Sequence, residues 1–315
     1  MTMSYTSTND DLYPSRQSGQ PRFIERVDPV VHGDHRGKGP LDECTLERYD
    51  RDGFLVRTSL FDADEIEILR EELVRMRREA AGSGSEETIC EPDSKVVRSI
   101  FRVHRSSPVF ARLARDARLV RVAEQILGDS VYVHQSRLNY KPGFRGKEFY
   151  WHSDFETWHV EDGMPHMRAL SVSISLLENT ENNGPLMLLP GSQRRFVSCV
   201  GETPEDHFRQ SLRRQEYGVP DDESLRELVI HSGIVSAPGP AGTGVFFDCN
   251  VMHGSNGNIT PLARSNVFIV YNAISNRVQA PFGARTPRPA FLAEREDFAP
   301  IAAVDGPIHR SRNAA

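Results

Sequence analysis

Residues 149–165 read F-Y-W-H-S-D-F-E-T-W-H-V-E-D-G-M-P, and the rest of the chain is organised around them. In an extended strand, side chains two positions apart point to the same face, so a strand over residues 150–156 would place His152 and Asp154 together. An imidazole and a carboxylate on one face are two of the three ligands of a 2-His-1-carboxylate facial triad. Such a triad holds Fe(II) and leaves coordination positions open, so the stretch predicts part of an iron site.

The third ligand is expected from His253, in the run D-C-N-V-M-H-G-S-N that follows apolar residues 245–247. The chain has 11 histidines, and most histidines are structural or face solvent, so the H-x-D pair alone would be weak support for a metal site. Arg264 follows shortly after and opens a strand-like run at 265–271. Its planar guanidinium can bind the far carboxylate of a C5 dicarboxylate co-substrate with two parallel hydrogen bonds. The combination therefore predicts iron and a dicarboxylate at one site.

The order H-x-D, distant His, then Arg resembles the iron(II)/2-oxoglutarate-dependent dioxygenases. Residues 183–193, N-G-P-L-M-L-L-P-G-S-Q, resemble the phytanoyl-CoA dioxygenase-like branch, with Gln193 in place of the His of its usual P-G-S-H ending. Residues 149–165 resemble the ectoine hydroxylases specifically, and the resemblance extends from about residue 22 to about residue 302.

The resemblance implies hydroxylation of the compatible solute ectoine to 5-hydroxyectoine, with release of succinate and CO2, as part of an osmotic stress response. Iron(II), 2-oxoglutarate and O2 would be required, with iron held by His152, Asp154 and His253. Arg264 would pair with the distal carboxylate of 2-oxoglutarate, and Ser255 would add a hydroxyl donor. Asn139 and Phe101 are expected to line the same co-substrate site.

Ectoine is a small zwitterionic ring, so its site should offer an aromatic wall, a few hydrogen bonds and a cation for the carboxylate. The residues expected there are Trp158 and Thr157 beside the iron ligands, Gln135 on the preceding strand, Phe247 before His253, and Arg288, which resembles the family's carboxylate-binding arginine. The competing interpretations are core packing for Trp158 and a solvated tail charge for Arg288. Glu161 and Asp162 receive no role, and neither His159 nor His166 is expected on iron.

Composition limits the alternatives. The chain has 315 residues, 38% of them hydrophobic, and a net charge of −6 without blocks of like charge, which argues against a nucleic-acid or membrane partner. No apolar run approaches the roughly 18 residues of a membrane helix, and the N-terminus lacks the apolar stretch of a signal peptide. Four scattered cysteines show no C-x-x-C spacing, so we expect a reducing, cytoplasmic location.

Periodicity predicts a mostly β protein preceded by helices. Asp62 and Glu65 form a capping-box start for a helix over residues 62–81, and further helices are expected from Ser107-Pro108 and over 118–127. Alternating or apolar runs predict strands at 131–140, 169–176, 185–189, 245–249 and 266–271. The family resemblance makes the specific fold a double-stranded β-helix, the jelly-roll, cupin-like type.

The expected organisation is a disordered tail at 1–20, a single dioxygenase domain at 21–305 with an insertion or lid at about 201–240, and a C-terminal tail at 306–315. The resemblance also suggests a homodimer. Two other functions fit the pattern less well. One is a hydroxylase of another small polar metabolite such as a free amino acid. The other is a non-catalytic metal-containing jelly-roll binding protein, against which the intact triad and Arg264 argue.

Overall fold

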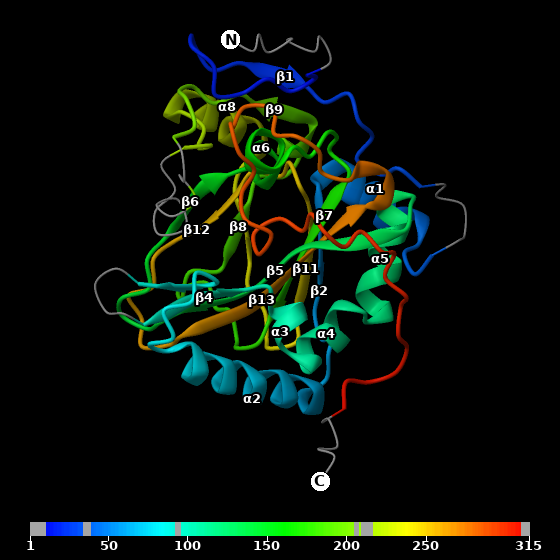
Figure 1. Cartoon of the computed structure of the whole chain (residues 1–315), viewed down its shortest axis with the longest axis vertical. Coiled ribbons are helices and arrows are strands. Elements are labelled where there is room, and N and C mark those ends of the chain that lie inside the picture. Colours follow the sequence, from blue (N-terminus) through cyan, green and yellow to red (C-terminus); the bar gives the residue numbers. More distant parts are fainter. Residues whose placement is uncertain (1–10, 34–38, 92–95, 205–207, 209–216, 310–315) are drawn as a thin grey trace, which may run out of the picture.

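The computed structural model describes residues 11–33, 39–91, 96–204, 208 and 217–309. Its main feature is a seven-stranded antiparallel sheet with the strand order β2-β11-β7-β13-β5-β4-β3 (Figure 1). The strands are β2 (Phe54–Arg57), β3 (Thr88–Cys90), β4 (Val97–Phe101), β5 (Val131–Lys141), β7 (Ala169–Ser175), β11 (Gly244–Asp248) and β13 (Arg264–Ala273).

A smaller sheet has four strands in the order β10-β8-β12-β6, and a two-stranded ribbon pairs β1 with β9. These strands are β1 (Phe23–Glu25), β6 (Phe149–His152), β8 (Leu186–Leu188), β9 (Arg195–Val197), β10 (Val235–Ala237) and β12 (His253–Ser255). Side chains of β8 and β10 form one buried cluster with Phe247 of β11 and Phe268 of β13, so the two sheets share a core. The predicted jelly-roll fold with flanking helices is confirmed, and among the described residues the sheets do not close into a barrel.

Helices cover the outer face of the large sheet: α1 (Glu43–Asp52), α2 (Ala63–Ala80), α3 (Val103–Ser106), α4 (Pro108–Ala114) and α5 (Ala117–Leu127) (Figure 1). Helix α2 begins with the predicted capping box, in which Asp62 accepts from the backbone of Glu65 and Glu65 accepts from that of Asp62. Its apolar stripe of Ile66, Leu69 and Leu73 is buried. Burial of each such side chain contributes about 1.5–3 kcal/mol to the free energy of folding. The described helices include none long and apolar enough to span a bilayer.

Alternation along the central strands gives the large sheet two different faces. Leu170, Val172 and Ile174 of β7 pack in the cluster under the helices. The alternate positions carry Ser171 and Ser173, which lie on the opposite face with Gln135 and Asn139 of β5. These polar side chains are buried, so they line an interior between the sheets and not a solvated surface.

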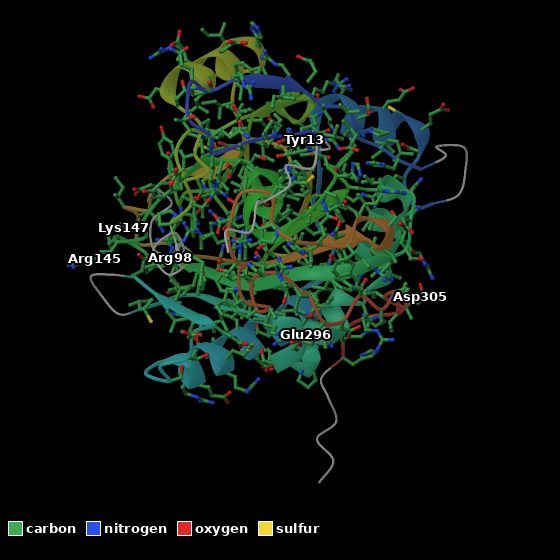
Figure 2. The ribbon with its side chains drawn as sticks, turned by 45° about the horizontal axis from the view of Figure 1, so that its top comes forward. Tyr13, Arg98, Arg145, Lys147, Glu296 and Asp305 are labelled. Carbon is green, nitrogen blue, oxygen red and sulfur yellow. The ribbon has the colours of Figure 1, made fainter. Side chains whose placement is uncertain are left out.

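The chain ends are ordered further than the sequence predicts. The predicted disordered tail is wrong for residues 13–17, because Tyr13 (Figure 2) is fully buried and Arg16 is 6% exposed. At the other end Ile308 is 2% exposed and its N–H donates to Glu65 Oε1, so the predicted C-terminal tail packs against helix α2 at this residue. Residues 1–10 and 310–315 lie outside the described residues. Residues 281–309 form no helix or extended strand.

The predicted insertion at 201–240 is only partly within the described residues, since 205–207 and 209–216 lie outside them. Its described part holds α8 (Asp222–Ser232), which begins where Asp221 accepts hydrogen bonds from Glu223 and Ser224. The segment ends in β10, which pairs antiparallel with β8. Residues 235–237 are therefore part of the smaller sheet and not of an insertion.

Candidate metal centre

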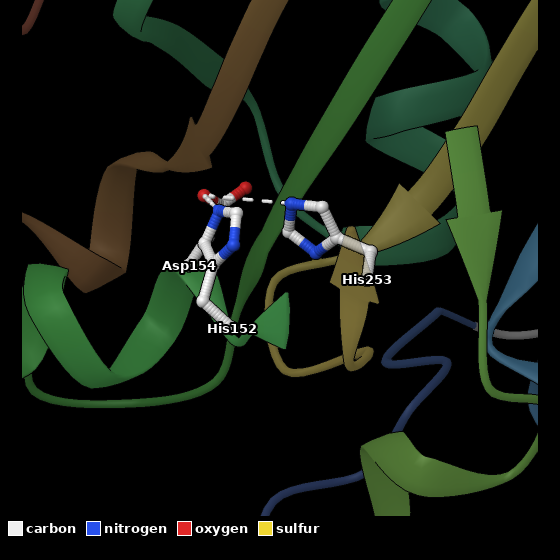
Figure 3. Close-up of side chains that lie close together, drawn as sticks. All are labelled: His152, Asp154 and His253. Carbon is white, nitrogen blue, oxygen red and sulfur yellow. Dashed lines mark ion pairs between the residues drawn. The ribbon is translucent and has the colours of Figure 1, made fainter. Parts of the chain in front are cut away.

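His152, Asp154 and His253 meet at one point, as the sequence predicts (Figure 3). Their ligand atoms all lie within 4.8 Å of one another. Asp154 Oδ1 is 3.8 Å from His152 Nε2 and 4.0 Å from His253 Nε2. The two histidines are opposite each other on the paired strands β6 and β12, so strand pairing brings residues distant in sequence into contact.

The local structure around Asp154 differs from the prediction of a strand over residues 150–156. Strand β6 ends at His152, and Asp154 is the first residue of α6 (Asp154–Thr157), which continues into a π-helix, η1 (Trp158–Asp162). Ser153 is extended, and its Oγ donates to Asn250 Oδ1, which fixes the turn between strand and helix. The turn, and not the alternation of a strand, directs Asp154 towards the histidines.

Hydrogen bonds set the tautomer and direction of both imidazoles. His152 Nδ1 lies 2.7 Å from the Tyr150 carbonyl oxygen, and His253 Nδ1 lies 3.0 Å from that of Val251. Carbonyl oxygens only accept, so Nδ1 carries the proton and donates, and each Nε2 keeps its lone pair for a metal ion. Ser171 Oγ donates to Asp154 Oδ2 at 3.2 Å and orients the carboxylate in the same way.

The pKa values of His152 and Asp154 favour the forms of these side chains that can bind a metal ion. Burial, together with neighbouring His253, lowers the pKa of His152 to about 4, so this imidazole is neutral at pH 7. Burial raises the pKa of Asp154, but His253 and Arg137 outweigh it and hold that pKa below its usual range. Two imidazoles and one carboxylate are the donor set of non-haem Fe(II) sites with open positions. The residues therefore fit iron(II).

Two buried basic side chains, which form a cation pair when Lys141 is protonated, lie on neighbouring strands of the large sheet. Arg264 opens β13, and Lys141, which ends β5, is its partner across the strands. Each residue is 4% exposed. Burial lowers the pKa of Arg264 to about 10, and burial with nearby Arg264 lowers the pKa of Lys141 to about 6. Neither forms an ion pair with a carboxylate of the described residues, so this position would stabilise a bound anion.

Hydrogen bonds connect this cation pair to the histidine strand. Lys141 Nζ donates to Ser255 Oγ at 2.9 Å and to the Asn256 carbonyl, and Ser255 lies two residues after His253 on β12. Arg264 donates through Nε to Asn266 Oδ1 at 2.9 Å and through Nη1 to the Gly184 carbonyl. Ser255 and Arg264, predicted to act together, are thus joined through Lys141.

The remaining two predicted co-substrate residues lie on the paired strands β5 and β4. Asn139 stands opposite Asn266 on the interior face of the sheet, and its Oδ1 accepts from Ser99 Oγ at 2.8 Å. Phe101 ends β4 and packs in a separate cluster, with its ring centroid 6.1 Å from that of Phe291. The structure gives Asn139 a position beside the arginine strand and gives Phe101 contacts with the C-terminal segment.

A family model described as phytanoyl-CoA dioxygenase (PhyH) matches residues 49–266 of the chain. The ectoine dioxygenase of Stutzerimonas stutzeri is 59% identical over 291 residues, which are 92% of this chain and 96% of that relative. The chain belongs to the PhyH family, among its ectoine dioxygenases.

Solved structures of PhyH-family relatives agree with this assignment. EctD from S. alaskensis, in a crystal structure with 2-oxoglutarate and 5-hydroxyectoine, superposes with a TM-score of 0.87 at 51% identity. The match covers 95% of this chain and all of that one. A crystal structure of the same relative with bound Fe gives a TM-score of 0.86 at 50% identity, with the same coverage.

In this PhyH-family chain, the predicted substrate residues occupy different surroundings. Phe247 is fully buried, and its ring lies 5.0 Å from that of His253. Trp158 is 2% exposed in a cluster with Tyr13 and Phe155, so the alternative of core packing describes its environment. Gln135 donates through Nε2 to the Leu292 carbonyl at 2.7 Å, which ties the β5 strand to the C-terminal segment.

Arg288 is not a solvated tail charge. It is 9% exposed and donates to both carboxylate oxygens of Asp162, through Nε at 2.9 Å and through Nη2 at 2.5 Å. Asp162, for which the sequence predicts no role, holds this arginine. His159 and His166 are not part of the triad, and a ring nitrogen of each pairs with a carboxylate, that of Asp11 or Asp28.

Sequence reasoning missed Arg137 and Lys141 as site residues. Arg137 Nη1 donates to Gln135 Oε1 at 2.6 Å, its guanidinium carbon lies 4.8 Å from the ring centroid of Phe268, and its charge lowers the pKa of Asp154. The sequence does contain a pattern that could have indicated these residues. Four polar side chains alternate along one strand and therefore share a face: Gln135, Arg137, Asn139 and Lys141. Only burial shows that this face is interior.

Proposed function

We propose that the protein hydroxylates ectoine to 5-hydroxyectoine in a reaction that depends on iron(II) and 2-oxoglutarate and releases succinate and CO2. The buried triad of His152, Asp154 and His253 next to two buried cations is the observation that carries this proposal. Bound iron would supply the oxygen activation that the reaction requires. The relatives named ectoine dioxygenase, and the EctD structure with 2-oxoglutarate and 5-hydroxyectoine, support the substrate.

The co-substrate would bind between the iron ligands and the cation pair. Arg264 and Lys141 supply positive charge for the distal carboxylate of 2-oxoglutarate, and Ser255 supplies a hydroxyl. Asn139 lies on the same interior face, and Phe101 lies on the neighbouring strand β4, opposite Arg137. The other end of the co-substrate would reach the iron, where one aspartate and two histidines leave coordination positions open.

Binding of 2-oxoglutarate should take up a proton at Lys141. In the free protein the pKa of Lys141 is about 6, so its amine is mostly neutral at pH 7.5. A bound carboxylate favours the charged amine and raises that pKa. Affinity should therefore fall as pH rises above 6, by at most about tenfold per pH unit for one linked proton.

Anaerobic calorimetry with Fe(II), in two buffers of different ionisation enthalpy, measures this uptake directly. We expect nearly one proton per 2-oxoglutarate at pH 7.5 in the wild type and a clearly smaller number in Lys141→Met. Exposed Lys147 provides the matched control, because Lys147→Met should leave the uptake unchanged. Equal proton uptake by wild type and Lys141→Met would remove Lys141 from the co-substrate site.

Ectoine would lie on the α6 side of the iron centre. Arg288, held by Asp162, is the cation for its carboxylate, and Thr157 follows the iron ligand Asp154 in the same helix. Gln135, Trp158 and Phe247 would complete the site, with Phe247 against His253 and Trp158 supplying an aromatic face for the amidinium.

The aromatic contribution of Trp158 can be measured through ectoine affinity. Losing a cation–π contact of about 1–2 kcal/mol should raise the KM for ectoine roughly tenfold. Trp158 is also a core residue, and Trp158→Ala would cost about 3–5 kcal/mol in stability through the cavity it leaves. We therefore expect Trp158→Leu, which retains bulk without the π face, to weaken ectoine binding while iron and 2-oxoglutarate binding persist. Unchanged ectoine kinetics in Trp158→Leu would exclude the contact.

Product identification tests the proposed function as a whole. Purified protein with Fe(II) and 2-oxoglutarate should convert ectoine to 5-hydroxyectoine, identified by NMR or mass spectrometry, with equimolar succinate. Free proline and acyl-CoA esters should be poor substrates or inactive. Comparable turnover of proline would favour a hydroxylase of another small metabolite, and iron binding without succinate formation would favour a non-catalytic binding protein.

The cellular setting is part of the same proposal. A cytoplasmic homodimer acting in the osmotic stress response is what the sequence predicts, and free thiols at all four cysteines fit a reducing compartment. Light scattering of the purified protein and the growth of a deletion strain at high salt would test the dimer and the physiological role separately.

A further inference from the structure

Three carboxylates of residues 149–165, the stretch that contains His152 and Asp154, are buried and follow Asp154 within eight positions of the sequence. Glu156 lies in α6, and Glu161 and Asp162 lie in η1, with exposures of 1%, 4% and 0%. Buried carboxylates require cations or several hydrogen bonds. The cations that meet them come from opposite ends of the chain: Arg288 binds Asp162, and Arg16 binds Glu156 and Glu161.

All three guanidinium nitrogens of Arg16 donate hydrogen bonds to carboxylates of this helical segment. Nε and Nη2 donate to the two oxygens of Glu156 at 3.0 and 2.8 Å, and Nη1 donates to Glu161 Oε1 at 2.6 Å. Nη2 also approaches Thr157 Oγ1 at 3.3 Å, and Nη1 donates to Thr203 Oγ1 at 3.0 Å. A single N-terminal side chain therefore contacts an acid on each side of the predicted substrate residue Thr157.

The segment that carries Arg16, residues 13–17, is fixed in place as an N-terminal strap. Arg16 has φ 52°, a left-handed conformation that is unfavourable for a residue with a side chain and persists only where its surroundings enforce it. Its N–H donates to the Cys199 carbonyl, and the Cys199 N–H donates to Ser15 Oγ, both at 2.8 Å. Tyr13 packs against Phe155 with ring centroids 5.3 Å apart.

Glu161 connects the strap to the substrate arginine. Its Oε1 binds Arg16, while its Oε2 lies 4.0 Å from Arg288 Nε. Arg288 meanwhile donates to Asp162. Glu161, Thr203 and Arg288 also line one cavity of about 390 Å³. Without Arg16, Glu161 would be a buried charge that lacks its nearest cation. Arg288 would then be the closest cation available to pair with Glu161.

We propose that Arg16 is a positioning residue for substrate binding: by neutralising Glu156 and Glu161 it keeps Arg288 and Thr157 directed at the ectoine site. The inference rests on the proposed function, because it concerns ectoine affinity. In this proposal the buried acids Glu156, Glu161 and Asp162 share one role. They bind arginines from both ends of the chain to the helical segment that begins at Asp154.

Steady-state kinetics of the full-length enzyme test this role. Arg16→Gln should raise the KM for ectoine at least roughly tenfold, the loss expected when a charged hydrogen bond to the ligand is displaced. The KM for 2-oxoglutarate and the iron content should stay within about twofold, since Arg264 and the triad do not contact the strap. Succinate formed per 5-hydroxyectoine should rise. The matched control is Arg194→Gln, which breaks an exposed ion pair with Asp50.

Two further variants separate positioning from general stability. Arg16→Lys keeps the charge without the planar guanidinium, so its KM for ectoine should lie between those of the wild type and Arg16→Gln. The double variant Arg16→Gln/Glu161→Gln removes the surplus buried charge and should recover most of the ectoine KM. Because it restores the charge balance, it also gives a folded protein for measurement if Arg16→Gln alone does not melt cooperatively.

The proposal is overturned if folded Arg16→Gln keeps the wild-type ectoine KM. It is also overturned if ectoine KM, 2-oxoglutarate KM and iron content decline together with Tm and the double variant recovers none of them, because that is the result of a merely structural role. Both outcomes leave ectoine conversion by the wild type intact. Failure of the proposed function would instead appear as a wild-type enzyme that does not hydroxylate ectoine.

Discussion

Replacing His152, Asp154 or His253 by alanine is expected to lower both iron content and ectoine turnover to below about one hundredth of the wild-type values. Substitutions of groups that only hydrogen-bond to a metal ligand already lower metal affinity or activity about 10–100-fold. A site with three protein ligands has no spare donor. Their ligand atoms lie within 4.8 Å of one another, so each contributes directly to the same position. Iron analysis and product formation measured on the same purified variants provide the comparison.

The control for this series is a histidine that is close in sequence but not at the site. His159 looks suitable from the sequence, but it is 1% exposed, and its ring stacks on that of Phe282 with centroids 4.0 Å apart, so its removal would also damage the core. The side chain of His166 is exposed and its ring pairs with Asp28, which makes His166→Ala the better control. Full iron occupancy and activity in Asp154→Ala would disprove the triad.

Arg264→Lys is expected to raise the KM for 2-oxoglutarate by roughly ten- to a hundredfold, with little change in the KM for ectoine. The wild-type guanidinium is held by the Asn266 side chain and the Gly184 carbonyl, which fixes the direction of its remaining N–H groups. A lysine ammonium keeps a charge but lacks the planar arrangement for bidentate binding. Burial would also favour its neutral form, as it does for neighbouring Lys141.

Kinetics with each substrate varied in turn distinguish the possible outcomes. Arg194→Lys, at an exposed position where the side chain pairs with Asp50, should behave like the wild type and controls for the loss of an arginine. If Arg264→Lys weakens ectoine binding alone, then Arg264 belongs to the substrate site and not to the co-substrate site. Addition of a small guanidinium compound should partly restore 2-oxoglutarate affinity in Arg264→Ala if the guanidinium itself is what the site lacks.

Local patterns determined much of the fold. The capping box at Asp62, the apolar stripe of α2 and the alternation in β7 each depend on residues close together in sequence, and each was predicted close to its observed bounds. The strand predicted through Asp154 was wrong because Ser153 turns the chain into α6 through a contact with Asn250, which is distant in sequence. The ends of the chain were misjudged for the same reason, since a polar composition does not reveal buried partners.

The ligands of the iron centre could be predicted from local sequence, because H-x-D, a later histidine and an arginine indicate them by residue type and order. The electrostatic environment of the site follows from the tertiary structure alone. Arg16 and Lys141 acquire their roles through burial next to Glu156, Glu161 and Ser255, residues at least a hundred positions away along the chain. Charges interact through space and with the surrounding dielectric, so their effect follows from the fold and not from local sequence.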